Sequence, residues 1–387
     1  MTRALDGILA LDFSTTIAGP HCARLLADLG AEVIKIEPPE GDMMRARLPT
    51  RNGASAVFGE LNAGKKSVVL DLKNKAASDA ARRLARMADV IVENYRPGVM
   101  RRLGLDYARL ASDNPRLVYC AISGYGQTGP SASLPAYAPV IHAASGYDLG
   151  HLAYQENRIR PDNAGIFIAD VLAGTYGFGA IMTALYQREA TGRGQMIDLS
   201  MLESMLSLML TELQTAQFEL EPAGRSIFGP IEAADGYVTA AVASERTFQA
   251  LCQAACREDW IADPRFARYR ERRLNWNQLI DELELWSKER SCAECLAAFE
   301  ATGVPASAYR TVAEAMCDPQ LAHRNAFVEV RDAGGVFKAL NPPFRMTGTE
   351  TSAGTIAAAL GEHTESVLAR IGLSEAEIAA AMARSER

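Results

Sequence analysis

The sequence has few of the features that mark specialised classes of protein. Its seven cysteines are an odd number spread over 387 residues, at positions 22, 120, 252, 256, 292, 295 and 317. That usage argues for reduced thiols rather than a disulfide framework. Cys292 and Cys295 form a single CxxC in a stretch typical of a helix capped by Ser291, and no second Cys or His pair lies at zinc-site spacing. We therefore expect core thiols and no metal site.

An excess of positive charge is also missing. The formal net charge is −7, and the arginine-rich stretch 265–273 leads directly into acidic residues at 281–284. This pattern indicates a solvated helix face rather than a nucleic-acid surface. No apolar run approaches transmembrane length, and Asp6 and Asp12 interrupt the N-terminal region where a signal sequence would be apolar. We expect no nucleic-acid partner, no membrane association and a cytoplasmic location.

What is present is the pattern of an α/β protein. Residues 7–14 read as a buried strand, 19–30 as a helix with Pro20 in its first turn, and 32–37 as another strand. The alternation continues with strand 67–70, helix 76–87, and strands 90–93 and 117–123. Such an order predicts a doubly wound, Rossmann-like parallel sheet. No GxGxxG follows the first strand, so the usual dinucleotide binding is disfavoured.

The second half of the chain predicts a smaller companion domain. A buried helix begins near Ile168, a glycine turn at 192–194 ends it, and strand 196–200 and helix 201–218 follow. Short strands, such as 236–242, and amphipathic helices then continue to about residue 325. The tail from 361 shows two helices separated by Gly372. We predict a large domain from 1–220 plus 326–387, and a small α+β domain from 221–325.

Short segments in a fixed order along nearly the whole chain resemble a known enzyme family. They are LDFSTTIAGP (11–20), GAEVIKIEPPEGD (30–42), LNAGKKSVVLDLK (61–73), DVIVENYRPGVMRRLGL (89–105), SGYGQTGP (123–130), DNAGIFIADVLAG (162–174), TGRGQMIDLSMLES (191–204) and GEHTESVL (361–368). Each is weak alone, but together they are a strong signal. The sequence resembles the family III coenzyme A transferases, the group of formyl-CoA, oxalate and carnitine CoA-transferases and the related α-methylacyl-CoA racemases.

The resemblance implies that Asp170 is the catalytic nucleophile. The neighbouring residues are consistent with this role. An ionised carboxylate among apolar neighbours at the start of a helix is costly to bury unless its charge is stabilised, and functional sites are where that cost is tolerated. The alternative is a helix-capping Asp without chemistry. In the implied reaction Asp170 takes the acyl group from an acyl-CoA as an anhydride, becomes an aspartyl-CoA thioester, and passes CoA to a free carboxylic acid.

Two further segments carry candidate catalytic residues. The glycine-rich run 124–129, with Gly126 and Gln127, is the kind of loop whose backbone N–H groups can stabilise an anionic tetrahedral intermediate, although an ordinary turn has the same composition. Tyr137 matches a tyrosine found in some transferases, at the place where the racemases carry a proton-abstracting His. His142, further along, reads as a packed or surface residue.

For the coenzyme, the resemblance implies binding by residues from several loops. They are Thr16, Ile17, Ala18, Lys73, Asn94, Tyr95 and Arg102. Asn and aromatic side chains suit an adenine ring, whereas cations and a helix N-terminus suit phosphates. Each alone is also a common surface or turn residue. CoA is expected as a substrate, with no permanently bound cofactor.

Three functions remain open from the sequence. The favoured one is a CoA-transferase acting on acyl-CoA and small carboxylic acids; the alternatives are an α-methylacyl-CoA racemase or epimerase, and a CoA-binding protein without turnover. Arg158 and Arg160 suggest a dicarboxylate such as succinate, itaconate or mesaconate, although solvated loop arginines are the simpler interpretation. The resemblance also implies a homodimer.

Overall fold

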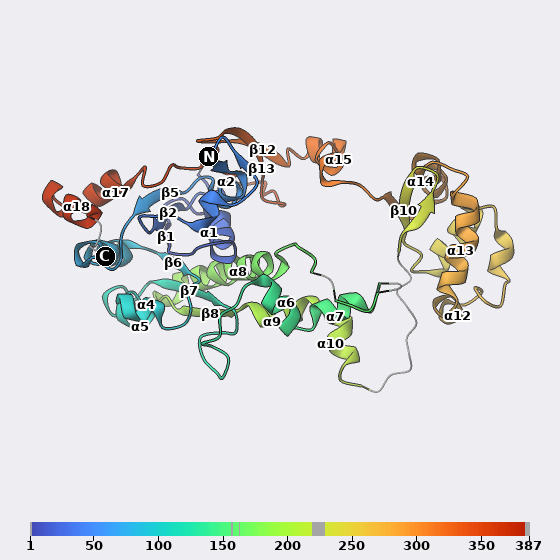
Figure 1. Cartoon of the computed structure of the whole chain (residues 1–387), viewed down its shortest axis with the longest axis horizontal. Helices are drawn as coiled ribbons and strands as arrows, with labels where there is room; N and C mark the ends of the chain where they lie inside the picture. Colours follow the sequence, from blue (N-terminus) through green and yellow to red (C-terminus); the bar gives the residue numbers. More distant parts are fainter. Residues whose placement is uncertain (1, 156–157, 162, 219–228, 384–387) are drawn as a thin grey trace. The chain divides into compact units, whose positions relative to one another are not determined.

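The computed structural model describes residues 2–155, 158–161, 163–218 and 229–383. The chain forms two compact units, each considered by itself (Figure 1). Unit 1 comprises Met1–Gly150, Ile159–Leu210 and Gln320–Arg387, and unit 2 comprises His151–Arg158 and Thr211–Pro319. The domain boundary predicted at 220/221 lies outside the described residues.

Unit 1 is built on a six-stranded sheet in which every strand pair is parallel. The spatial order is β5-β2-β1-β6-β7-β8. The strands are β1 (Leu9–Asp12), β2 (Glu32–Glu37), β5 (Lys66–Val69), β6 (Val90–Glu93), β7 (Val118–Ser123) and β8 (Met196–Ser200). The predicted doubly wound parallel sheet is confirmed. Strand order reverses between β1 and β6, which is where such sheets form a ligand crevice at their carboxyl edge.

Helices cover both faces of this sheet because successive strand residues point to opposite sides. Ala10 of β1 belongs to one apolar core and its neighbour Leu11 to the other. The first core is completed by α1 (Ala18–Asp28), α6 (Ala138–Ala144), α8 (Ile168–Thr191) and α9 (Met201–Leu208). The second is completed by α3 (Lys75–Met87), α4 (Val99–Leu103), α5 (Tyr107–Asp113), α17 (Thr364–Arg370) and α18 (Glu375–Met382). The two tail helices separated by Gly372 are thus confirmed.

Several short elements of the chain were not predicted. They are η1 (Met43–Ala46), β3 (Thr50–Arg51), β4 (Ala54–Ser55), α2 (Ala56–Asn62), α7 (Tyr147–Leu152), α16 (Pro319–His323), β12 (Phe327–Asp332) and β13 (Gly335–Leu340). The strands pair as two antiparallel hairpins, β3 with β4 and β12 with β13. Elements this short carry too few residues for a clear periodic signal.

Unit 2 has its own apolar core around an antiparallel sheet of order β11-β10-β9. Its elements are α10 (Leu210–Thr215), β9 (Ile231–Ala233), β10 (Gly236–Ala240), α11 (Glu245–Ala254), η2 (Glu258–Ile261), α12 (Tyr269–Leu274), α13 (Trp276–Ser287), α14 (Cys292–Thr302), β11 (Ala306–Ala308) and α15 (Val312–Met316). Ser291 caps α14 as predicted, and Cys295 is buried in the core.

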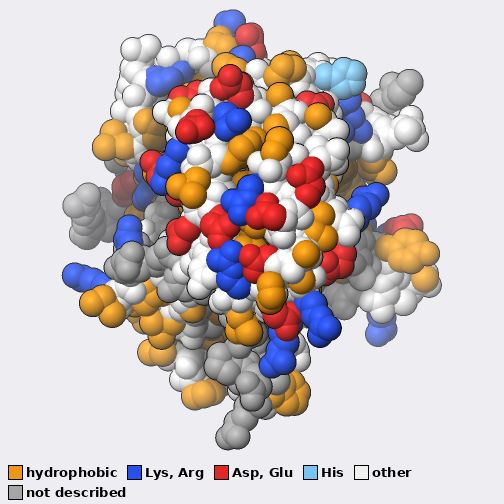
Figure 2. All heavy atoms as spheres, turned by 90° about the vertical axis from the view of Figure 1, so that its right-hand side faces the viewer, with side chains coloured by type: hydrophobic (Ala, Val, Ile, Leu, Met, Phe, Trp, Pro, Cys, Tyr) orange, Lys and Arg blue, Asp and Glu red, His pale blue; other side chains and the backbone are white. Residues whose placement is uncertain are grey.

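The surface of unit 2 carries charges of both signs. Figure 2 shows acidic and basic side chains interspersed over the face that it views. Ion pairs such as Lys288 with Glu284, at 2.7 Å, are present within unit 2. One arginine of the 265–273 stretch departs from the prediction of a solvated face. Arg272 is buried, pairs with Glu245, and lies over the Phe248 ring at 4.2 Å.

Two sequence expectations about apolar helices were wrong. The helix predicted for 201–218 is two helices, α9 and α10, because Met209 leaves helical geometry (φ −94°, ψ 59°) where the chain passes from unit 1 to unit 2. The second expectation was that no apolar run approaches transmembrane length. Among the described helices, α8 is long and apolar enough to cross a membrane by length and composition alone. It packs against α1, β7 and α9, which is the position of a core helix.

Candidate active site

Asp170 lies in the first turn of α8. The helix begins after Phe167, so Asp170 is its third residue, and only 9% of its surface is exposed. The C-terminal end of α8 leads into β8, which is parallel to its neighbour β7, so the N-terminus of α8 lies at the carboxyl edge of the sheet. Burial raises the pKa of Asp170 from 3.8 to about 6. The carboxylate is therefore mostly ionised at neutral pH but poorly solvated, which favours reaction as a nucleophile.

A histidine supports the backbone beside Asp170. Nε2 of His142, in α6, accepts a hydrogen bond from the backbone N–H of Ala169 at 3.2 Å. This N–H is one of the donors that the first turn of a helix leaves unpaired. Burial lowers the pKa of His142, although Asp148 opposes the shift. The neutral ring must then carry its proton on Nδ1, a buried atom without a hydrogen-bond partner among the described residues. His142 is 1% exposed, so the packed interpretation is confirmed.

The loop after β1 is held from the neighbouring strand β6. The N–H of Thr15 donates to Oδ1 of Asn94 at 2.8 Å, and Nδ2 of Asn94 donates back to the carbonyl oxygen of Thr15 at 2.8 Å. Thr16 adopts a left-handed conformation (φ 63°), which is uncommon for a residue with a branched side chain. A Cβ on Gly19 would stand 2.1 Å from Cβ of Ser14, so only glycine lets α1 start this close to the loop. The chain that leaves β1 at the carboxyl edge of the sheet is therefore a constrained loop.

The same loop lies against the first turns of α8. Ile17 packs in a small apolar cluster with Phe167, Met44 and Phe58. One turn along α8, a Cβ on Gly174 would stand 2.6 Å from the carbonyl oxygen of Ala18, so the two helices approach closely at this point. The predicted positions 16–18 and Asp170, far apart in sequence, are thus brought together.

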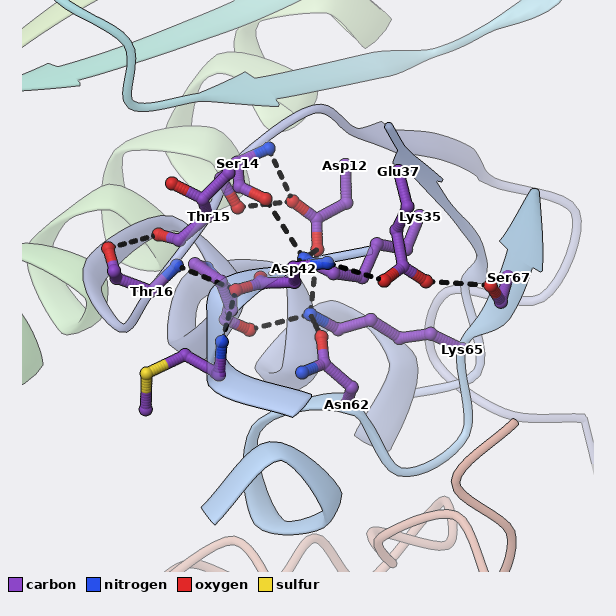
Figure 3. A network of polar contacts seen from close by, with 12 residues as sticks. Asp12, Ser14, Thr15, Thr16, Lys35, Glu37, Asp42, Asn62, Lys65 and Ser67 are labelled. Carbon is purple, nitrogen blue, oxygen red and sulfur yellow. Dashed lines mark hydrogen bonds and ion pairs between the residues drawn. The ribbon is translucent and has the colours of Figure 1, made fainter. Parts of the chain in front are cut away.

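A buried network of charges lies beneath the loop (Figure 3). Nζ of Lys65 is 2.7 Å from Oδ2 of Asp12, and Nζ of Lys35 is 2.9 Å from Oδ2 of Asp42. Lys35 also donates to the carbonyl oxygen of Ser14 at 2.9 Å. Oδ1 of Asp42 accepts from the N–H of Met44 at 2.9 Å and, more weakly, from that of Thr16 at 3.5 Å. Buried ion pairs and hydrogen bonds therefore link the loop after β1 to the segment after β2.

The pKa values show how tightly these charges depend on each other. Burial by itself would raise the pKa of Asp12, but Lys65 and Lys35 outweigh it and the pKa is lowered. Burial lowers the pKa of Lys65 to about 8, although Asp12 opposes this. Removing one partner would leave a buried charge uncompensated, which is strongly destabilising.

The glycine-rich loop after β7 packs beside α6. A Cβ on Gly124 would stand 2.3 Å from Cβ of Ala136, and Gly126 has φ 89°. The backbone N–H of Gln127 donates to both carboxylate oxygens of Asp198, at 2.9 and 3.1 Å. This N–H is already used, so it is not the free donor that the sequence suggested. Nε2 of Gln127, in contrast, is buried and has no hydrogen-bond partner among the described residues.

Comparison with known proteins decides the family. The model of CoA-transferase family III matches residues 5–364. The chain belongs to this family. It is 36% identical over 348 residues to the acetyl-CoA:oxalate CoA-transferase of Acetobacter aceti, covering 87% of this chain and 88% of that protein. It is 32% identical over 388 residues to the succinate–glutarate CoA-transferase of Agrobacterium fabrum, covering 95% of each.

Solved structures agree. Rv3272 of Mycobacterium tuberculosis superposes with a TM-score of 0.83 at 31% identity, covering 94% of this chain and 99% of that one. A CAIB/BAIF family protein of Brucella suis gives a TM-score of 0.84 at 30% identity, covering 96% and 100%. The chain is therefore an enzyme, a family III CoA-transferase, and CoA is a substrate of the reaction that defines the family.

The other predicted site residues of this family III CoA-transferase lie at the surface, in the core on the opposite face of the sheet, or in support of the loop after β1. Tyr137 precedes α6 and is 61% exposed. Tyr95 packs against the core on the opposite face of the sheet from α8. Lys73 and Arg102 are exposed, and no hydrogen bond or ion pair of the described residues joins either to the loop after β1. Asn94 has its amide oxygen occupied by Thr15, so it supports the loop rather than offering that oxygen to an adenine.

Sequence reasoning missed the charge network, although a signal was present. Asp12 and Lys35 are directly opposite each other on β1 and β2, and both side chains are buried, although Asp12 is the last residue of its strand. Oppositely charged residues in two successive apolar strands indicate an internal ion pair once the strands are known to be neighbours. Among the parts of the chain that the structure describes, no group of three His, Cys, Asp or Glu is placed to hold a metal ion.

Proposed function

We propose that this transferase moves CoA from an acyl-CoA donor to a free carboxylic acid through covalent intermediates on Asp170. The observation that carries the proposal is the state of this carboxylate. It is buried at the start of α8, its pKa is raised to about 6 by burial, and no hydrogen bond or ion pair of the described residues engages it. An ionised carboxylate without a neutralising partner is expensive to keep, and nucleophilic catalysis explains why it is kept.

The steps follow from carboxylate chemistry. An Asp170 oxygen attacks the thioester carbon, the C–S bond breaks, and CoA leaves as the thiolate, giving an acyl-aspartyl anhydride. The thiolate then attacks the aspartyl carbonyl, which releases the donor acid and leaves an aspartyl-CoA thioester. The acceptor carboxylate attacks this thioester, and the returning thiolate converts the new anhydride to product acyl-CoA and free Asp170. No proton is transferred, so the cycle needs no general base.

We also propose that the acid carries two carboxyl groups. The relatives of Acetobacter aceti and Agrobacterium fabrum are named for transfer to oxalate and between succinate and glutarate, and a third, from Chloroflexus aurantiacus, is a succinyl-CoA–D-citramalate CoA-transferase that is 31% identical over 396 residues. All of these acids have at least two carboxyl groups. This supports a dicarboxylate as donor acid, acceptor acid or both.

A homodimer is the proposed assembly. Large apolar side chains at and beyond the start of α8 remain exposed in one chain, among them Ile166 at 67%, Val171 at 42% and Tyr186 at 83%. Burying them against a second copy would remove a substantial apolar area from water. Light scattering should report a mass near twice 41.8 kDa, and a stable monomer at micromolar concentration would contradict the proposal.

The mechanism is tested by trapping the intermediate. Wild-type protein incubated with succinyl-CoA alone should carry an adduct on the peptide that contains Asp170, cleaved by hydroxylamine and located by mass spectrometry. Asp170→Asn keeps the shape but removes the nucleophile, so it should form no adduct and lose several orders of magnitude in kcat. Asp113→Asn, at an exposed ion pair with Arg86, is the matched control and should behave as wild type. An adduct mapped to a cysteine would refute the mechanism.

A further inference from the structure

An arginine lies over the residue that precedes the nucleophile helix. Arg47 follows η1 and is exposed, and its guanidinium carbon is 4.9 Å from the centroid of the Phe167 ring. Phe167 is the N-cap residue of α8, three positions before Asp170. Phe167 directly precedes α8, so the Arg47–Phe167 pair lies at the end of the helix whose first turn carries Asp170. Arg47 is thus the cation stacked at the edge of the proposed reaction site.

The hydrogen-bonding capacity of Arg47 is open, unlike that of its near neighbour Arg45. Arg45 holds both oxygens of Glu37, with two contacts of 2.7 Å, and lies over the Phe58 ring at 3.9 Å. The side chain of Arg47 makes no hydrogen bond or ion pair to any described residue, and stacking on an aromatic ring leaves the in-plane N–H groups of a guanidinium free. These N–H groups form a planar fork that matches a carboxylate in a bidentate manner.

The position of Arg47 determines which anion its guanidinium group can bind. An acyl group bonded to Asp170 starts at the first turn of α8, which is the end of the helix at which Phe167 and Arg47 lie. The phosphates of CoA are separated from the thioester by the long pantetheine arm, so they lie far from a cation that is this close to the nucleophile. Of the two arginines suggested by the sequence, Arg158 belongs to unit 2, whereas Arg160 belongs to unit 1, as Arg47 and Asp170 do.

We propose that Arg47 binds the second carboxylate of the dicarboxylic acid and so makes the enzyme prefer diacids to monoacids of the same length. The inference rests on the proposed reaction at Asp170 and names the residue that selects its substrate. The Phe167 ring holds the guanidinium in place, and the small cluster of Ile17, Met44 and Phe58 holds the ring. The distal carboxylate then completes the contacts that Arg47 lacks.

The experiment compares matched acids. CoA transfer from acetyl-CoA is measured with succinate against butyrate and with glutarate against valerate, for the wild type, Arg47→Met, Arg47→Lys and the control Arg193→Met. Arg193 is an exposed arginine beyond the far end of α8. The ratio of kcat/KM for diacid over monoacid should fall by about tenfold to a hundredfold in Arg47→Met, because a charge-assisted bidentate contact is lost. Arg47→Lys should fall between, and Arg193→Met should match wild type.

The outcomes separate this inference from the reaction itself. If wild-type protein transfers CoA to none of the acids, the proposed function fails. If it transfers CoA but Arg47→Met keeps the diacid preference, or if diacid and monoacid rates fall together, only the role of Arg47 is overturned. A rise in KM for acetyl-CoA that is absent with 3′-dephospho-acetyl-CoA would assign Arg47 to a phosphate of the coenzyme instead, which also overturns the proposal.

Discussion

Nε2 of His142 and the backbone N–H of Ala169 are hydrogen-bonded at 3.2 Å, which joins α6 to the first turn of α8 one residue before Asp170. The ring is buried, and its neutral form provides the acceptor. A side chain from a different helix thus does what an N-cap residue usually does from within its own helix. Phe167, at the N-cap position, makes no side-chain cap of its own.

Replacing His142 should test this support. His142→Leu leaves the Ala169 N–H unpaired in a buried place, so the free energy of unfolding should fall by about 1–3 kcal/mol, and kcat should fall as the first turn loosens. His142→Gln can present a carbonyl oxygen to the same N–H and should restore most of kcat. Urea unfolding and steady-state kinetics measure the two effects. Equal losses of kcat in both variants would show that accepting this hydrogen bond is not the function of His142.

Asp170 should make activity depend on pH. Only the ionised carboxylate is a nucleophile, so kcat/KM should decrease as pH falls through about 6, where burial has placed the pKa. A profile of kcat/KM between pH 5 and pH 8 measures this. A flat profile over that range would show that the carboxylate titrates elsewhere.

The buried, ionised Asp170 carboxylate should lower the free energy of unfolding. Because the pKa is about 6 in the folded chain against 3.8 for an ordinary Asp, the folded state holds the proton more tightly. The cost is therefore absent below pH 3.8, grows as pH rises, and is complete above about pH 6. Asp170→Asn should thus be more stable than wild type by about 1–3 kcal/mol at pH 8, although it is inactive. The gain should vanish near pH 4 in chemical unfolding experiments, and a gain independent of pH would exclude charge burial as its cause.

Two glycines of α8 should respond oppositely to substitution. Gly174→Ala places a Cβ 2.6 Å from the carbonyl oxygen of Ala18, so α1 and α8 must move apart. We expect a loss of about 1–3 kcal/mol in unfolding free energy together with a higher KM for CoA, since the loop before α1 moves too. Gly179→Ala, in the same helix, meets nothing within 4 Å and should stabilise the chain by about 0.5–1 kcal/mol. Stabilisation by both variants would show that the close approach is not required.

The sequence by itself was sufficient to predict the architecture and to single out Asp170 as the candidate nucleophile. Buried strands and amphipathic helices alternate in the order of a doubly wound sheet, and period-two burial alone assigns Ala10 and Leu11 to different faces. Asp170 was a candidate because a carboxylate at the start of an apolar helix is costly to bury, and the family resemblance implied that it is the nucleophile. Such features are local or periodic, so they can be read along the chain.

Only the tertiary structure decided which distant groups meet. Asn94 pairs with Thr15, Gln127 gives its N–H to Asp198, and Arg47 reaches Phe167, although the partners are 79, 71 and 120 residues apart. The first pair depends on β1 and β6 being neighbours, the second on β7 and β8, and the third on the loop after η1 returning to α8. Residue type shows what a side chain can bind, but strand order and helix packing determine which partner is within reach and whether that capacity is left for a substrate.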